Sequence, residues 1–94
     1  NIANIYYIES QGHTLILHTI LGDYETTGKM KEMDEKLSRM NFCRGNKGYL
    51  INLQHVDRIQ DNCAVVKGEE LVLSRARKKE FMEALTRYWG EVIK

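Results

Sequence analysis

Residues 49–73, YLINLQHVDRIQDNCAVVKGEELVL, decide the fold because one pattern returns in them at short intervals. Runs of aliphatic and β-branched residues alternate with the polar turn signals Asp61-Asn62 and Gly68-Glu69. We predict strands at 49–53, 56–60, 63–67 and 71–73. The connections are too short for helical crossovers, so these strands are expected to form a meandering antiparallel sheet.

The residues before this stretch predict three further strands. Residues 5–8 are β-branched and aromatic, and residues 14–20 alternate two faces. Residues 24–27 follow Gly22-Asp23, which we expect to form the tight turn of a hairpin.

Two segments have the spacing of helices. The first carries an apolar stripe at i, i+3, i+7 and i+10, made by Met30, Met33, Leu37 and Met40. The second follows Ser74, a good N-cap, and its stripe consists of Phe81, Leu85, Tyr88 or Trp89, and Val92. Between them, the polar residues 41–48 are expected to form an exposed loop. The pattern therefore predicts a β-rich domain, α+β by content, with two helices.

Composition narrows the class of protein. The 94 residues, 43% of them hydrophobic, are enough for one domain over residues 1–94. They are too few for two domains with a catalytic cleft between them. No apolar run approaches the ~20 residues of a membrane helix, so we expect no membrane association. Two cysteines are too few for a secreted disulfide scaffold, which predicts a reducing, cytoplasmic location. We expect Cys43 and Cys63 to be buried thiols, with a redox pair across the sheet as the alternative.

The net charge of +1 hides an asymmetry between the two parts of the chain. Residues 1–35 carry two basic and six acidic side chains, a net charge of −4, whereas residues 36–94 carry twelve and seven, a net charge of +5. A polyanionic partner would explain this distribution, and so would two solvated surfaces of opposite sign.

Basic residues are densest at the start of the second predicted helix, in Ser74-Arg75-Ala76-Arg77-Lys78-Lys79. Cations at a helix N-terminus oppose the helix dipole, each at a cost of a few tenths to about 1 kcal/mol. A bound phosphate would offset that cost, because it meets both free N–H groups and the cations. The alternative is a frayed terminus whose side chains are screened by salt.

A second basic group lies in Arg44-Gly45-Asn46-Lys47-Gly48. The glycines would let the backbone approach a ligand closely, and the three polar side chains offer donors to phosphates or base edges. His13 lies in the loop between the first two strands, either as an ordinary surface residue or as a hydrogen-bonding partner of a base or phosphate.

Signatures of catalysis and of metal binding are missing from the sequence. No cysteine or histidine pair has CxxC or HxxxH spacing, and there is no phosphate-binding glycine motif or nucleophile elbow. We therefore expect no enzyme activity, no metal and no cofactor.

Four segments together resemble the LytTR family of DNA-binding domains. They are Ile5-Tyr6-Tyr7-Ile8-Glu9-Ser10, the predicted helix ending in Leu37, the run from Phe42 to Asn52, and Leu73-Ser74-Arg75 with Lys78-Lys79. The resemblance covers about residues 4–88 and departs from the family where Asn46 replaces a common His and Gly48 a common Ser. It implies an elongated, mainly β fold of small antiparallel sheets with two flanking helices. It also implies that an N-terminal strand of the complete domain precedes residue 1.

The resemblance further implies the output domain of a bacterial response regulator, joined to a receiver domain. Such domains bind direct repeats in promoters, often as homodimers, by inserting loops into the grooves of DNA. The matching positions imply groove contacts from His13, Lys47, Arg75 and Arg77.

We thus expect sequence-specific binding of double-stranded DNA by a transcriptional regulator. The predicted DNA-binding residues are His13, Arg44, Asn46, Lys47, Arg75, Arg77, Lys78 and Lys79. Among them, Arg44, Lys78 and Lys79 would mainly neutralise phosphates. The alternative is a protein-interaction β module that docks a partner through an exposed strand edge and binds no nucleic acid. Binding of single-stranded RNA ranks last, because Tyr6 and Tyr7 have no basic neighbours in sequence.

Overall fold

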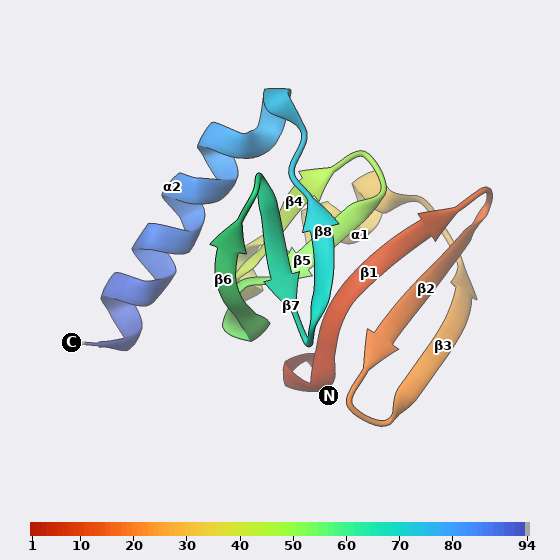
Figure 1. Cartoon of the computed structure of the whole chain (residues 1–94). Helices are drawn as coiled ribbons and strands as arrows, with labels where there is room; N and C mark the ends of the chain where they lie inside the picture. Colours follow the sequence, from red (N-terminus) through yellow and green to blue (C-terminus); the bar gives the residue numbers. More distant parts are fainter. Residues whose placement is uncertain (94) are drawn as a thin grey trace.

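The strands form two antiparallel sheets in the computed structural model, which describes residues 1–93 (Figure 1). The larger sheet has the order β3-β2-β1-β5-β4 and the smaller one the order β6-β7-β8. The larger sheet contains β1 (Ile5–Gln11), β2 (Thr14–Thr19), β3 (Gly22–Thr27), β4 (Phe42–Asn46) and β5 (Tyr49–Asn52). The smaller sheet contains β6 (Val56–Gln60), β7 (Cys63–Val66) and β8 (Glu69–Val72).

Two α-helices accompany the sheets, α1 (Met30–Leu37) and α2 (Arg75–Val92). Three short 3₁₀ turns complete the structure, at Ile2–Asn4, Ser38–Met40 and Leu53–His55. Helix α1 connects β3, at one edge of the larger sheet, with β4 at the other edge. Neither these helices nor any other helix within residues 1–93 is both long and apolar enough to span a bilayer.

The larger sheet separates two hydrophobic cores, because neighbouring residues on a strand face opposite sides. On β1, Tyr7 belongs to the core shared with the smaller sheet and α2, whereas Ile8 belongs to the core under α1. On β5, Ile51 and Leu50 divide in the same way. Helix α2 contributes the fully buried Phe81 to the first core.

The meander predicted over residues 49–73 is confirmed for β6, β7 and β8 but is wrong for β5. Strand β5 pairs with β4 and with β1 in the larger sheet, with Ile8 opposite Leu50. This pairing brings two segments from different parts of the chain to the centre of one sheet, so β6, β7 and β8 form a sheet of their own. All pairs are antiparallel, as predicted.

The predicted loop at 41–48 is largely a strand. Residues Phe42–Asn46 form β4 and pair with β5, so the backbone polar groups of this polar segment are satisfied by the ladder. Phe42 and Gly45 are buried. Only residues 47–48 remain as the turn.

The β2–β3 hairpin turns two residues earlier than predicted. Residues 20–21 form the turn, and Gly22 already pairs with Thr19 in β3. The hydroxyl of Thr19 closes the turn, because it donates to the Gly22 carbonyl over 2.6 Å and accepts from the Leu21 amide over 3.1 Å.

The last residue of each predicted apolar stripe is exposed instead of buried. Helix α1 gives way to a 3₁₀ turn at Ser38, and the change from 3.6 to 3.0 residues per turn leaves Met40 half exposed. In α2, Phe81 and Leu85 are buried as predicted, whereas Val92 is 60% exposed where the helix end projects beyond the sheets (Figure 1). Of the two aromatic candidates in α2, Tyr88 packs against the core and Trp89 is exposed.

The two cysteines are free, and their predicted burial is only partial. Cys43 lies on β4 in the larger sheet and Cys63 on β7 in the smaller one. Burial raises the pKa of the Cys43 thiol to about 11, with smaller contributions from Glu80 and Asp34.

Candidate nucleic-acid interface

Three connections lie one after another along the upper edge of the molecule in Figure 1. They are the β1–β2 turn at residues 12–13, the β4–β5 turn at residues 47–48, and the junction of β8 with α2 at residues 73–74. The backbone N–H of Ser10 donates to the Gly48 carbonyl over 2.9 Å, which joins the first connection to the second. The N–H of Ser74 donates to the Gly45 carbonyl over 2.9 Å, which joins the third to the second.

This end of the molecule gathers basic residues that are separated in the sequence, five lysines or arginines and one histidine. We call it the basic edge, and define it by His13, Lys47, Arg75, Arg77, Lys78 and Lys79. His13 and Lys47 are exposed in their turns, and Arg75 and Lys79 are exposed on α2. The Ser74–Gly45 backbone hydrogen bond places the start of α2, which carries Arg77, beside β4, whose Arg44 side chain contacts the turn that carries Lys47. Lys47 and Arg77 therefore lie at the same end.

Helix α2 begins without the usual compensation for its dipole. Ser74 occupies the N-cap position as predicted, but its side chain makes no capping hydrogen bond. The Ser74 carbonyl accepts from the amides of Arg77 and Lys78 over 3.1 and 2.9 Å. No acidic residue lies in the first turn of this fully described helix. The dipole and the side chains thus create positive potential at the same place.

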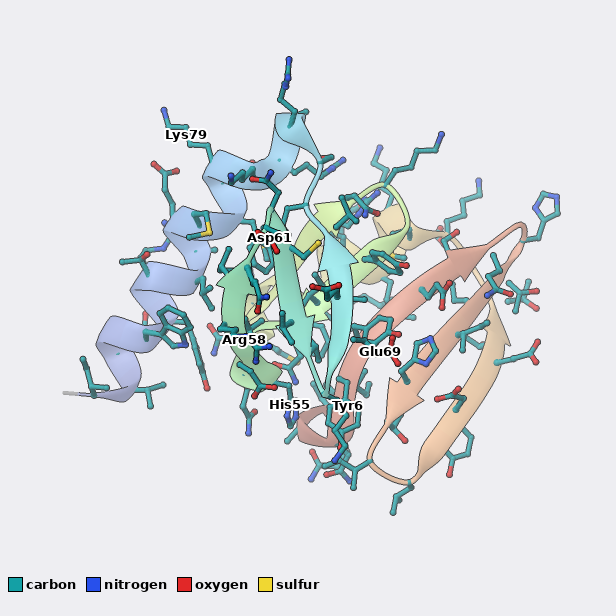
Figure 2. All side chains as sticks on the ribbon, in the orientation of Figure 1. Tyr6, His55, Arg58, Asp61, Glu69 and Lys79 are labelled. Carbon is teal, nitrogen blue, oxygen red and sulfur yellow. The ribbon has the colours of Figure 1, made fainter. Side chains whose placement is uncertain are left out.

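The cations of the basic edge are not neutralised by acidic side chains. Within residues 1–93, the only basic side chain at ion-pair distance from a carboxylate is the His18 ring on β2, whose nitrogens lie 2.9 and 3.1 Å from Glu9 and Asp23. Figure 2 shows Lys79 extending outward from the upper part of α2. Unpaired cations gathered at one end of a small domain attract polyanions and orient their approach.

A fourth segment, the β6–β7 turn, also reaches the basic edge. Its Asn62 accepts a hydrogen bond from the Lys78 ammonium through Oδ1, and its backbone carbonyl accepts from the Leu73 amide over 2.9 Å. Asp61 and Asn62 both adopt left-handed backbone conformations, with φ of 50° and 63°. The sequence predicted this turn from Asp61-Asn62, but local turn chemistry carries no information about its contact with α2.

The side chain of Arg44 folds back onto its own hairpin. Its Nε donates to the Asn46 carbonyl over 3.2 Å and its Nη2 to the Lys47 carbonyl over 2.9 Å. Partial burial lowers the pKa of Arg44, the nearby Arg77 lowers it further, and Asp34 opposes the shift. The sequence predicted that Arg44 contacts phosphate. In the structure, these two donors of its guanidinium instead bond carbonyl oxygens of the protein's own backbone.

Asn46 and Gly45 are likewise engaged within the fold. The Asn46 Nδ2 donates to the Val72 carbonyl over 2.6 Å, and its Oδ1 accepts from the Gly48 amide over 2.7 Å. A Cβ added at Gly45 would lie 2.7 Å from the Ile51 Cδ1. The predicted reason for this glycine, close approach to a ligand, is therefore wrong: Gly45 is buried and allows close packing inside the protein.

A small antiparallel domain with unneutralised cations from three connections at one end has the features of a nucleic-acid-binding domain. The family model described as the LytTr DNA-binding domain matches residues 1–86. The chain therefore belongs to the LytTR family of DNA-binding domains, as the sequence resemblance predicted.

A solved structure supports the same fold. The chain is similar to the LytTr DNA-binding domain of a protein from Bacillus cereus described as a methyl-accepting/DNA response regulator, with a TM-score of 0.80 and 16% identity. The similarity covers 88% of this chain and 82% of that one. The predicted mainly β architecture of small antiparallel sheets with two helices is thereby confirmed. No curated protein matches the chain.

Proposed function

We propose that this domain binds double-stranded DNA with sequence specificity, as the output domain of a bacterial transcriptional response regulator. Its family is one of DNA-binding domains, and the similar protein from Bacillus cereus is described as a response regulator. The observation that carries the proposal is the basic edge, because hydrogen bonds hold its three connections together and its cations lack acidic partners.

The turns of the basic edge have a shape suited to grooves. The β1–β2 and β4–β5 turns each end a two-stranded hairpin, and exposed His13 and Lys47 occupy them. In the proposed complex these two side chains, together with Arg75 and Arg77, reach base edges. An arginine with a free guanidinium can read guanine through two hydrogen bonds.

In this proposal, the start of α2 binds phosphates of the DNA backbone. Phosphate oxygens would accept from the free amides of its first turn and from the ammonium groups of Lys78 and Lys79. Such contacts fix the position of a protein on the duplex, and they release counterions, so affinity falls as salt rises.

The proposal extends to the assembly on DNA. A receiver domain would precede this domain in the complete regulator and control it. Two copies would occupy direct repeats in a promoter as a homodimer on DNA. The family to which the chain belongs supports these features.

Selection of bound duplexes from a random pool at physiological salt tests the proposal. We expect enrichment of one short motif, occurring as a repeat, and binding that weakens steeply between 50 and 200 mM salt. A useful comparison is Lys79→Ala with Lys67→Ala. Lys67 lies in the turn that follows β7, at the opposite end of that strand from Asn62 and the basic edge. Equal loss in both variants, or no enriched motif, would favour the protein-interaction module instead.

A further inference from the structure

The β4–β5 turn has only two residues, Lys47 and Gly48, and one side chain bonds the carbonyl of its first residue and that of the residue before it. Arg44 precedes the turn on β4 and bonds the carbonyls of both Asn46 and Lys47. A guanidinium is planar and offers donors at fixed spacing, so two bonds from one group fix the relative orientation of two peptide units. Arg44 is partly buried, which further limits its side-chain freedom.

The same turn is fixed to the neighbouring sheet by Asn46. One end of its amide accepts from the Gly48 N–H, which closes the turn, and the other donates to the Val72 carbonyl at the end of β8. Since β8 leads directly into Ser74 and α2, this amide connects the turn carrying Lys47 with the segment carrying Arg75.

We propose that Arg44 and Asn46 are positioning residues that set the base specificity of the domain by fixing the β4–β5 turn relative to the start of α2. The inference rests on the proposed function and assigns these two residues a different role from phosphate contact. Lys47 is then presented to the duplex by a turn that is ordered before binding. Preordering reduces the entropy lost on binding and makes a shifted, non-specific arrangement less accessible.

The substitution Arg44→Lys separates positioning from charge. It keeps the positive charge but cannot make two bonds at the spacing of a guanidinium. We expect discrimination between the selected duplex and a scrambled duplex to fall at least tenfold, with the slope of log K against log salt unchanged. Arg58→Lys is the matched control, because Arg58 lies within β6, is exposed, and bonds only Gln60 in the described structure (Figure 2).

The opposite outcome would overturn the inference. If Arg44 contacts a phosphate, Arg44→Lys will keep its discrimination, and Arg44→Ala will lower affinity for both duplexes alike and reduce the salt slope by about 0.9.

Asn46→Ser tests the second residue without changing charge. A serine hydroxyl is short enough to close the turn locally but does not reach the Val72 carbonyl, so the link to β8 is lost. We again expect weaker discrimination between the selected and the scrambled duplex, with the slope of log K against log salt unchanged. Retained discrimination would exclude a positioning role for Asn46.

Amide spectra of the free proteins make the test independent of DNA. In Arg44→Lys and Asn46→Ser, we expect the ¹H–¹⁵N signals of Lys47 and Gly48 to shift while those of β2 and β3 stay in place. If the wild-type protein binds no duplex, the proposed function fails and the specificity role falls with it. Unshifted turn signals in folded variants would overturn the inference on its own.

Discussion

The backbone N–H of Ser74 donates to the carbonyl oxygen of Gly45 over 2.9 Å. Strand β4 is an edge strand of the larger sheet, and this bond uses one of its outward-facing polar groups to fix the N-cap of α2. Four strands, β5 to β8, separate these two basic segments in the sequence, and the bond gives the segments one fixed relationship. The contact requires close approach, which explains why residue 45 has no side chain.

Gly45→Ala should destabilise the fold. The added Cβ would lie 2.7 Å from the Ile51 Cδ1 and 3.1 Å from a Leu73 methyl, and both of these side chains are buried. We expect a loss of about 1–3 kcal/mol in the free energy of unfolding, as is typical of overpacking. Urea denaturation followed by circular dichroism would measure it.

Gly48→Ser is the matched control for that variant. A Cβ at Gly48 meets only the Asn46 Oδ1, at an ordinary contact distance of 3.6 Å. Its unfolding free energy should stay within about 0.5 kcal/mol of the wild-type value. Equal destabilisation by both substitutions would mean that Gly45 has no special packing role.

Lys79→Ala should weaken binding to all duplexes by a similar factor. Lys79 is exposed and has no acidic partner, so it is available to a phosphate. Its loss should reduce the slope of log K against log salt by about 0.9. Fluorescence anisotropy at several salt concentrations would test this, and a change confined to one sequence would contradict it.

Arg75→Ala should act on base choice. Arg75 is exposed at the first position of α2, on the basic edge. If its guanidinium bonds a guanine through two donors, the substitution costs about 1–3 kcal/mol on the preferred duplex and much less on a scrambled one. A repeated selection with the variant would show relaxed preference at one base pair; an unchanged motif would remove Arg75 from the reading of bases.

Tyr7 makes the stability sensitive to alkaline pH. Its ring is stacked on His18 at 4.3 Å between centroids, and burial, followed by the charge of Glu9, raises its pKa from 10.0 to about 12. The unfolded chain therefore loses this proton at lower pH than the folded one, so stability falls between pH 10 and 12. The shift corresponds to about 2–3 kcal/mol.

Comparison with Tyr7→Phe isolates this contribution from other alkaline titrations. The difference in unfolding free energy between wild type and variant should change by that amount across the same pH range, and stay constant from pH 7 to 9. If the difference in unfolding free energy between wild type and variant stays constant up to pH 12, Tyr7 has the same pKa in the folded and the unfolded chain.

Cys43 should react slowly with alkylating reagents at neutral pH. Since the thiolate is the nucleophile, a pKa of about 11 leaves little reactive form at pH 7. Mass spectrometry of the Cys63→Ser variant treated with iodoacetamide would follow Cys43 alone. The rate should rise as pH increases toward 11; alkylation at the rate of a small free thiol at pH 7 would contradict the burial of this side chain.

Sequence alone determined much of the local structure. The strands at 49–73, the start of α2 after Ser74 and the buried Phe81 and Leu85 follow from side-chain periodicity and capping, which act between close neighbours. The clustering of Arg75, Arg77, Lys78 and Lys79 is also visible in the sequence itself.

The tertiary structure decided which of these segments meet. The pairing of β1 with β5, the arrival of Asn62 beside Lys78, and the engagement of Arg44 and Asn46 within the fold all depend on hydrogen-bond partners. Most of these partners are far apart in the chain, and a local pattern shows only that a side chain can donate or accept. Its partner is selected by the packing of the two cores, which brings distant backbone groups within bonding distance and leaves other cations facing solvent.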